Sequence, residues 1–385
     1  MKEGWKTVKL GEVCTFNKEQ GMFSSLKYVG MEHIESGTGI VVGGLNSTEI
    51  KSNTFKFYRG DVLYGRLRPY LKKVFVAEHE GCCSTEIFPI KTTLNPYFLK
   101  YWFLSEEVTI KINKTCGGCR MPRANMNEVL TFYISFPPLE EQQRIVSILD
   151  ASFEKIDALK KNAKENLKNA KALFQQVLAQ ELKPKEGWVE KKLGEICEIT
   201  SSKRIFKNEY TENGIPFYRT KELKELAHGR NISLELFISE SRYNDIKAKF
   251  GVPQIGDILI SAVGTIGETL IIDNVNPFYF KDGNIVWLRK INGVNSNFLK
   301  ISIDSIVEKL KSITRGAAYN ALTIEKLKEM QITYPILEEE QIKILSTIQT
   351  LSEKCRRLEQ VAQQTIRECD ALKQSILRQA FSGEL

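Results

Sequence analysis

The chain has 385 residues, of which 42% are hydrophobic and 26% charged, and its 55 Lys and Arg against 47 Asp and Glu give a formal charge of +8. This balance and the length predict an ordinary globular protein of two or three domains, which excludes the fibrous and disordered classes. Because no apolar run reaches the roughly 18–20 residues of a membrane helix and the N-terminus lacks a secretory signal, we expect a cytoplasmic protein with no membrane partner, whose eight Cys stay reduced.

The first segment, residues 1–137, has the pattern of a mixed α+β domain. Short β-branched and aromatic runs are broken by Gly, Asn and Pro, which is typical of strands. We expect strands at residues 60–64 and 73–77, and short helices at residues 96–103 and 125–129.

The start of the helix predicted at residues 96–103 allows two interpretations. Asn95-Pro96-Tyr97-Phe98 resembles the Asn-Pro-Pro-aromatic motif of amino-methyltransferases. However, the second Pro is missing, and no Gly-rich loop for S-adenosylmethionine precedes the motif. We therefore interpret Asn95 as the start of a helix and not as a catalytic residue.

A long helix is predicted over residues 138–182. Apolar positions alternate four and three residues apart, which is the heptad pattern of a coiled coil sustained for about five heptads. Pro137-Pro138 stands at the helix start, where proline is tolerated, and Pro184 closes the helix. The expected seam positions are Ile145, Leu149, Ser152, Ile156, Leu159, Ala163, Asn166, Ala170, Leu173 and Val177.

The remainder of the chain repeats the first part in the same order, so the protein contains an internal duplication. Strands are expected at residues 258–262 and 284–288, and a short helix at residues 324–330. The recurring motifs are residues 3–5 with 186–188, 9–14 with 192–197, 60–64 with 256–260, 98–100 with 298–300, 137–141 with 335–339, and 181–182 with 384–385.

The second copy also ends in a long helix, over residues 336–385. A lone helix with an apolar stripe must bury that stripe, so the two helices are expected to pair. Only residues 183–187 join the first helix to the domain that follows it, and so short a linker favours antiparallel packing. The expected seam positions are Ile348, Leu351, Cys355, Leu358, Ala362, Thr365, Cys369, Leu372 and Ile376.

The sequence therefore predicts an α+β fold with an internal pseudo-two-fold repeat, in which a long antiparallel two-helix coiled coil separates two mixed α/β domains. The expected domains are residues 1–137 and 183–335, and the expected spacer helices are residues 138–182 and 336–385. The domains carry net charges of +5 and +4, and the helices 0 and −1. A mild basic excess suits a polyanionic partner without requiring one.

Four stretches give the chain a resemblance to a known family. Residues 60–71, 256–267, 137–142 and 372–385 resemble, in this order and duplication, the DNA-specificity subunit of type I restriction-modification systems. The resemblance covers nearly the whole chain. It implies two target-recognition domains that each read one half of a bipartite double-stranded DNA site, in a non-catalytic subunit that directs a partner methyltransferase to that site.

The resemblance also implies partners and cofactors. The methyltransferase (modification) subunits would dock largely on the helices, and a restriction subunit would join them where the system has one. The resemblance implies that this chain binds no cofactor: the partner carries out adenine-N6 methylation from S-adenosylmethionine, and ATP and Mg are likewise expected in the partner subunits. The docking candidates are Leu139, Gln142, Ile145, Leu337, Gln341 and Phe381.

An alternative from another class stays open, namely a non-enzymatic two-lobed scaffold that binds RNA or an acidic protein. A steep loss of binding with salt, together with preference for one duplex sequence, would distinguish DNA recognition from it. A stand-alone enzyme is disfavoured because the sequence has no nucleophile, metal or nucleotide motif.

The strongest DNA-contact candidates lie in loops. Arg66, Arg68 and Tyr70 follow a predicted strand on a loop bounded by Gly and Pro, where Arg is suited to guanine or phosphate; the alternative is a solvated turn with Tyr70 packed on the core. A second pair of loops combines Gly, Arg and Asn, the residue types for guanine, phosphate and adenine, although a flexible turn would look the same. Its candidates are Arg120, Arg123 and Asn125 in the first copy, and Arg315, Tyr319 and Asn320 in the second.

Weaker candidates are isolated. Lys72, Lys73, Arg219 and Lys281 would contact phosphate, although single basic residues usually face water. Thr265 lies on a loop without a cation, where Gly residues favour close backbone approach. The Cys116/Cys119 pair suggests a zinc or redox site, but the second copy has no Cys there and the three His do not cluster with the pair, so we predict no metal.

Overall fold

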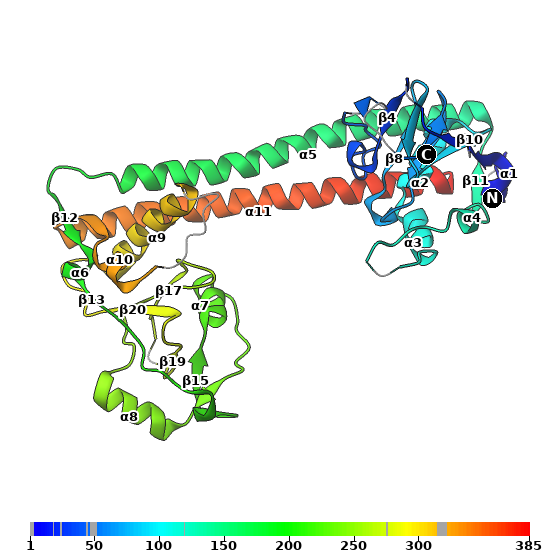
Figure 1. Ribbon diagram of the computed structural model, residues 1–385. Helices are drawn as coiled ribbons and strands as arrows, with labels where there is room; N and C mark the ends of the chain where they lie inside the picture. Colours follow the sequence, from blue (N-terminus) through cyan, green and yellow to red (C-terminus); the bar gives the residue numbers. More distant parts are fainter. Residues whose placement is uncertain are drawn as a thin grey trace. The chain divides into compact units, whose positions relative to one another are not determined.

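The computed structural model describes residues 4–17, 19–23, 25–43, 45–46, 52–118, 120–274, 276–313 and 322–385. The chain forms two compact units. Unit 1 comprises Met1–Asn166 with Val361–Leu385, and unit 2 comprises Leu167–Gln360. Each unit contains one mixed α/β lobe and part of both long helices (Figure 1). We call residues 4–138 lobe 1 and residues 182–337 lobe 2.

Lobe 1 is built on an antiparallel four-stranded sheet. Its strands, in sheet order, are β2 (Cys14–Phe16), β10 (Ile87–Thr92), β7 (Val62–Gly65) and β8 (Val74–Val76). The central strand β7 is buried along its whole length, which explains its continuous run of β-branched, aliphatic and aromatic residues. Its position confirms the strand predicted at residues 60–64, and β8 confirms the one at 73–77.

Two further sheets complete lobe 1. A five-stranded sheet has the order β3 (Gln20–Gly21), β6 (Thr54–Phe57), β9 (Gly81–Ser84), β4 (Lys27–Val29) and β5 (Leu45–Asn46). A two-stranded sheet pairs β1 (Lys6–Lys9) with β11 (Tyr133–Phe136), and thus ties the start of the lobe to the residues just before the long helix.

Lobe 2 repeats this arrangement. Its antiparallel four-stranded sheet has the order β13 (Glu198–Ser201), β20 (Ile285–Arg289), β17 (Ile258–Ser261) and β18 (Thr269–Ile271). A two-stranded sheet pairs β12 (Trp188–Lys192) with β21 (Gln331–Pro335). A further sheet has the order β14 (Tyr210–Thr211), β16 (Phe237–Ile238), β15 (Ile215–Tyr218) and β19 (Tyr279–Phe280). The predicted internal repeat is therefore confirmed in the strand order of the four-stranded and two-stranded sheets, whereas the third sheet has five strands in lobe 1 and four in lobe 2.

Helices cover the sheets of both lobes. Lobe 1 has α1 (Leu10–Val13), α2 (Pro96–Leu104), α3 (Glu106–Lys114), α4 (Met126–Val129) and the 3₁₀ turns η1 (Met31–His33) and η3 (Pro69–Leu71). Lobe 2 has α6 (Leu193–Ile196), α7 (Thr220–Ala227), α8 (Glu240–Phe250), α9 (Ser296–Ile313), α10 (Ile324–Lys328) and η4 (Lys207–Glu209). The side chain of Asn95 accepts hydrogen bonds from the backbone of Tyr97 and Phe98, so the interpretation of this motif as a helix start is confirmed.

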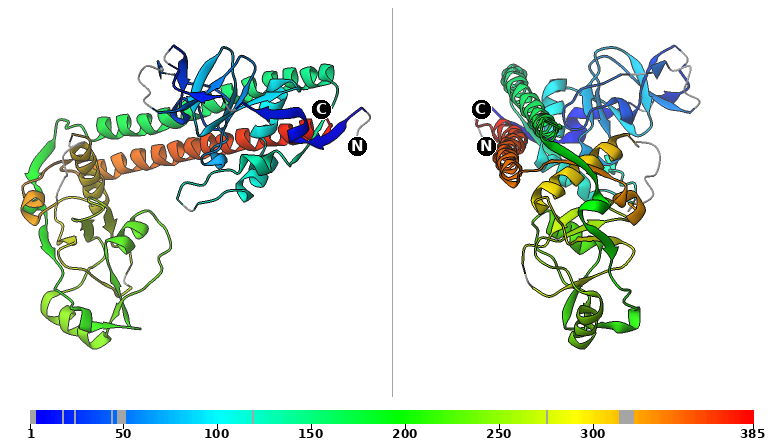
Figure 2. Two further views of the ribbon diagram at one scale, coloured as in Figure 1. Left: turned by 45° about the vertical axis from the view of Figure 1, so that its right-hand side comes forward. Right: turned by 90° about the vertical axis from the view of Figure 1, so that its left-hand side faces the viewer.

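The two longest helices are α5 (Leu139–Glu181) and α11 (Glu338–Ser382), and both views of Figure 2 show them side by side. They pair antiparallel. In unit 1, Asp157 accepts from Lys373 at 2.5 Å, while Lys160, one turn further along α5, pairs with Asp370, one turn earlier on α11. The coiled coil predicted from the heptads, and its antiparallel direction predicted from the short linker, are thus confirmed. Among the residues described, no helix combines the length and apolarity needed to cross a membrane.

The seam between the helices differs from the predicted one at some of its alternate positions. Leu149, Ile156, Ala163 and Ala170 are buried as expected, and the further predicted seam residues Ser152, Val177, Leu351, Thr365 and Ile376 are half-buried. Leu159 and Leu173 are exposed, and so are Leu358 and Leu372 on α11. The buried or half-buried residues in their place are Phe153, Lys160, Leu167, Phe174, Glu359, Ile366 and Lys373.

Each lobe is joined to the long helices by a buried glutamine. Gln142 is 3% exposed; its amide donates to the carbonyl of Pro137 at 2.8 Å and accepts from the backbone of Asn95 at 2.8 Å. In unit 2, Gln341 donates to Pro335 at 2.8 Å and accepts from Asn295 at 2.7 Å. Each amide therefore links the start of a long helix to the first turn of a lobe helix.

Candidate nucleic-acid interface

The two candidate loops of lobe 1, far apart in the sequence, lie side by side. Loop A (residues 65–70) follows β7, and loop B (residues 116–125) connects α3 to α4. Leu67 and Arg123 form a β-bridge between the loops. The backbone of Arg68 donates to Pro122 at 2.8 Å, and that of Ala124 donates to Arg66 at 2.9 Å. The structure thus brings the candidates of both loops onto one surface, which we call the two-loop surface.

Two of its arginines share one carboxylate. The Nε atoms of Arg66 and Arg123 donate to the two oxygens of Glu86, at 3.0 and 2.8 Å. Glu86 lies in the turn between β9 and β10, and its side chain is 20% exposed. The Arg66 guanidinium also lies over the ring of Phe88, 5.3 Å from its centroid. Both guanidiniums are therefore held in place but still reach the surface, because their side chains are 32% and 42% exposed.

The other candidates of loops A and B are less constrained. Arg68, Tyr70 and Arg120 are exposed, and the guanidinium of Arg68 has no hydrogen-bond or ion-pair partner among the described residues. The backbone of Arg68 has φ of +52°, an unfavourable conformation for a side-chain-bearing residue that costs on the order of 1–3 kcal/mol. Asn125 caps α4 through its side-chain oxygen, at 3.4 Å from the backbone nitrogen of Glu128, so its oxygen is already engaged.

The two lysines after loop A have partners inside lobe 1. Lys72 forms an ion pair with Glu106 of α3, and its side chain is largely covered. Lys73 donates to the carbonyl oxygen of Met31 at 2.6 Å. Both lysines therefore hold the loop against its neighbours, which weakens the prediction that they contact phosphate.

Arg219 in lobe 2 is likewise committed to acidic partners. Its guanidinium contacts Glu222 at 2.6 Å and Glu235 at 2.7 Å, and these hydrogen bonds raise the pKa of Arg219, that from Glu222 most. Lys221 and Arg219 together lower the pKa of Glu235 to about 2. These carboxylates already neutralise the charge of Arg219, and its phosphate contact stays a prediction. Glu222, three residues after Arg219 at the start of a helix, was the sequence signal for this pairing.

The loop of lobe 2 that corresponds to loop A makes an equivalent backbone hydrogen bond but carries no cationic side chain. Thr265 is exposed, and its carbonyl accepts from the Ser261 hydroxyl. The backbone of Leu322 donates to Ala262 at 3.2 Å, in the place of the bond between Ala124 and Arg66. Lys281 is half-buried. Arg315, Tyr319 and Asn320 lie outside the described residues, as does Cys119.

The docking candidates divide into exposed and buried residues. Leu139 and Leu337 are 60% and 67% exposed, so both offer surface to a partner. Gln142, Gln341 and Ile145 are buried, so their side chains take part in this chain's own packing, and their docking role stays a prediction. Phe381 is half-buried against Phe98, with ring centroids 5.1 Å apart.

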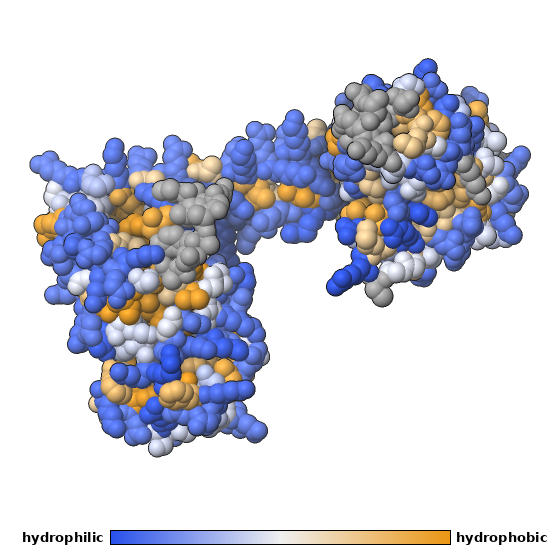
Figure 3. All heavy atoms as spheres, viewed as in Figure 1, coloured by the Kyte–Doolittle hydropathy of each residue, from blue (hydrophilic) through white to orange (hydrophobic). Residues whose placement is uncertain are grey.

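Several apolar residues of the long helices face outward, which their heptad spacing alone did not indicate. Leu159, Val361 and Leu372 are exposed in unit 1, and Leu173 and Leu358 in unit 2. On the face seen in Figure 3, the helix pair is mostly hydrophilic, with hydrophobic residues in a row along it. The heptad spacing of the four leucines was visible in the sequence, but it was assigned to the seam between the helices.

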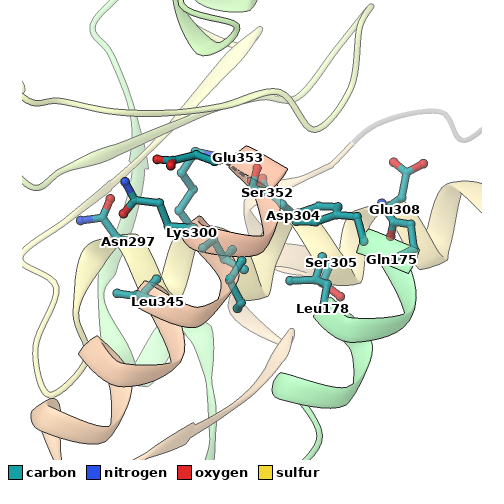
Figure 4. A pocket seen from close by; sticks show the side chains of 14 residues that line it. Gln175, Leu178, Asn297, Lys300, Asp304, Ser305, Glu308, Leu345, Ser352 and Glu353 are labelled. Carbon is teal, nitrogen blue, oxygen red and sulfur yellow. Dashed lines mark hydrogen bonds and ion pairs between the residues drawn. The ribbon is translucent and has the colours of Figure 1, made fainter. Parts of the chain in front are cut away.

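Unit 2 has a cavity of about 690 Å³ between α9, α5 and α11 (Figure 4). Lys300 and Asp304 of α9, which pair at 2.6 Å, line one side of it. In unit 1 the residue that the repeat matches to Ile301 of this cavity is Tyr101, whose ring packs against that of Phe153 with centroids 5.3 Å apart. The two units therefore share a fold but differ in how they fill the junction of lobe and helices.

No cluster of three potential metal ligands occurs within the described part of the chain.

Comparison with known proteins agrees with this architecture. The family model for the type I restriction modification DNA specificity domain matches twice, over residues 2–169 and 185–368. The EcoDI specificity subunit of Escherichia coli is 30% identical over 154 residues, which span 40% of this chain and 35% of that subunit. A putative specificity subunit of Haemophilus influenzae, S.HindORF215P, is 30% identical over 281 residues, spanning 68% of this chain and 66% of the relative.

Solved structures resemble the chain over its full length. A chain from a study of complex assembly and conformational transition in a type I R-M system gives a TM-score of 0.82 at 25% identity, and covers 100% of this chain and 99% of that chain. The HsdS subunit of Thermoanaerobacter tengcongensis gives 0.61 at 25% identity, with 100% and 98% covered. The match of the family model to both copies shows that this chain belongs to the family of type I restriction modification DNA specificity domains.

Proposed function

We propose that this chain is the non-catalytic specificity subunit of a type I restriction-modification complex, and that it reads a bipartite site in double-stranded DNA. The observation that carries the proposal is that the two lobes, whose four-stranded sheets have the same strand order, present different loops at the same place. Lobe 1 has an arginine where lobe 2 has Ala262, so each lobe would read its own half-site. Arginine and asparagine on such loops suit contacts with base edges in a groove.

The helices supply the partner surface in this proposal. The exposed leucines Leu139, Leu159 and Leu337 are of the kind that another helix covers. A methyltransferase subunit would dock there and carry S-adenosylmethionine, and a restriction subunit with ATP and Mg would join where the system has one. This chain would contribute recognition only.

Methylome sequencing tests the proposal. Cells would express the chain with its methyltransferase subunit, and residues 1–137 would then be exchanged for the lobe of another family member. Because the lobes are separate units in their packing, only one half of the methylated motif should change. A simultaneous change of both halves would contradict independent reading. Binding of RNA or of an acidic protein in place of duplex DNA would support the scaffold alternative.

A salt titration adds a second criterion. Each neutralised phosphate should contribute about −0.9 to the slope of log affinity against log salt for duplex DNA. A sequence-specific complex should also keep its preference for the methylated motif at each salt concentration. Equal affinity for every duplex would contradict the proposal.

A further inference from the structure

Glu86 is the one acidic residue that contacts arginines of both loop A and loop B in the described part of lobe 1. Its two oxygens receive one Nε–H each, from Arg66 and from Arg123. The Nη groups of Arg66 donate to no described residue, and Phe88 lies against the face of that guanidinium. The guanidinium of Arg66 is thus held at its Nε edge by Glu86 and on one face by Phe88, while its Nη edge remains available to a ligand.

Lobe 2 is an internal control for this cluster. In lobe 1 the backbone of Arg66 donates to Glu86 at 2.9 Å, and in lobe 2 the backbone of Ala262 donates to Asn284 at 2.8 Å. The two pairs occupy the same place in the two sheets, since Gly65 pairs with Ile87 as Ser261 pairs with Ile285. Where the arginine is absent, the glutamate is absent too, yet the backbone pairing persists. The cluster is therefore not needed to form the fold.

Stability alone does not account for the cluster. Partly exposed ion pairs typically contribute about 0–1 kcal/mol, because solvent screens them. Fixing the orientation of an arginine has a different benefit, because a pre-positioned guanidinium loses less conformational entropy when it binds.

The charges indicate which ligand suits the cluster. Two guanidiniums and one carboxylate leave a net charge of +1, and the carboxylate would repel a nearby phosphate. The acceptor edge of guanine, O6 and N7, is uncharged and matches a guanidinium edge bidentately. The cluster is thus better suited to a base edge than to the DNA backbone.

We propose that Glu86 is a positioning residue that orients Arg66 to read a guanine in the half-site of lobe 1. The inference rests on the proposed function, and it adds the base and the residue that orients the arginine. Arg123 completes the cluster by holding the second oxygen of Glu86.

The test uses the full chain in complex with its methyltransferase subunit. The variants are Arg66→Ala, Glu86→Gln and the double variant, with Glu268→Gln in lobe 2 as the matched control, because Glu268 is also partly covered and pairs with His228 at 3.1 Å. Affinity is measured on the cognate duplex and on duplexes with each base pair of the first half-site replaced. Thermal unfolding of each variant checks the fold.

Arg66→Ala should reduce discrimination at one guanine by about 5- to 150-fold, the range for a bidentate base contact. Glu86→Gln should reduce discrimination at the same guanine, and should add nothing in the Arg66→Ala background. Replacing that guanine with 7-deazaguanine, which lacks N7, should weaken the wild-type complex and leave the Arg66→Ala complex unchanged. Glu268→Gln should leave the first half-site unaffected.

Other results would overturn the inference. A first half-site without guanine would do so, as would unchanged discrimination in Glu86→Gln. A phosphate contact would instead give equal losses on all duplexes and a salt slope reduced by about 1. These failures differ from failure of the proposed function, in which the wild-type complex itself would show no sequence preference.

Discussion

Removal of the buried amide of Gln142 should destabilise unit 1 strongly. In Gln142→Ala, the backbone N–H of Asn95 and the carbonyl of Pro137 lose their partner in a place where the side chain is 3% exposed. A buried polar group without a partner costs about 1–3 kcal/mol, so two such groups cost about 4 kcal/mol in total. For a unit of this size, 1 kcal/mol shifts the melting temperature by about 2–4 °C, which predicts a decrease of about 8–16 °C.

The adjacent residue provides the control. Gln143 accepts a hydrogen bond from the side chain of Asn95 at 2.7 Å but is exposed, so water can replace this bond and Gln143→Ala should cost less than about 1 kcal/mol. Calorimetry gives the melting temperatures, and hydrogen exchange at the Asn95 amide reports the local effect. If the two variants melt together, or if the Asn95 amide exchanges no faster in Gln142→Ala, the reasoning about the buried amide is wrong.

Three further predictions concern charge and packing. Burial raises the pKa of Asp257, so its contribution to stability is present below the unfolded-state pKa of about 3.9 and is lost as pH rises through the folded-state pKa. In urea titrations, the unfolding free energy of Asp257→Asn relative to wild type should therefore rise with pH and then level off. A pH-independent difference would contradict this. Lys72→Ala should leave the salt slope of DNA binding unchanged because Lys72 is paired with Glu106, whereas Arg68→Ala should reduce that slope by about 1. Equal slopes in the two variants would show that the ion pair of Lys72 does not keep it from the phosphates. Ala163→Leu should destabilise the helix seam by about 1–3 kcal/mol, because Ala163 is buried there. Leu159→Ala should change stability by less than about 0.5 kcal/mol and weaken assembly with the methyltransferase. If denaturant melts show that Leu159→Ala loses more stability than Ala163→Leu, Leu159 belongs to the seam as the heptads predicted.

The long helices and their direction were predictable from the sequence, but the seam was only half predictable. Small residues such as Ala163 and Cys355 mark the buried line, and both are buried. The neighbouring line was assigned to leucines, because apolarity was taken as burial. The structure places the stems of Lys160 and Lys373 there instead, with their ammonium groups paired to Asp370 and Asp157. A long basic side chain can cover a seam while a carboxylate neutralises its charge, and hydropathy does not report this.

The candidate site was predictable as residue types and not as contacts. Loops A and B were both identified from their Arg, Gly and Pro content. Their pairing through Leu67 and Arg123 depends on the sheet register and on the position of α3, which a single sequence does not specify. Glu86 was missed because an isolated glutamate after a strand has no distinguishing pattern. Its significance comes from the two arginines that fold brings to it.

The glutamine joints bear on how such proteins diversify. Gln142 and Gln341 hydrogen-bond to main-chain atoms, which every amino-acid sequence possesses. A lobe acquired by recombination therefore needs no particular side chain to engage the glutamine, only a helix that starts at the same point and a carbonyl in the same place. Junctions placed just before residues 139 and 338 would keep each glutamine with its long helix. New combinations of lobes would then keep the glutamine contacts without a second adaptive step at these hydrogen bonds.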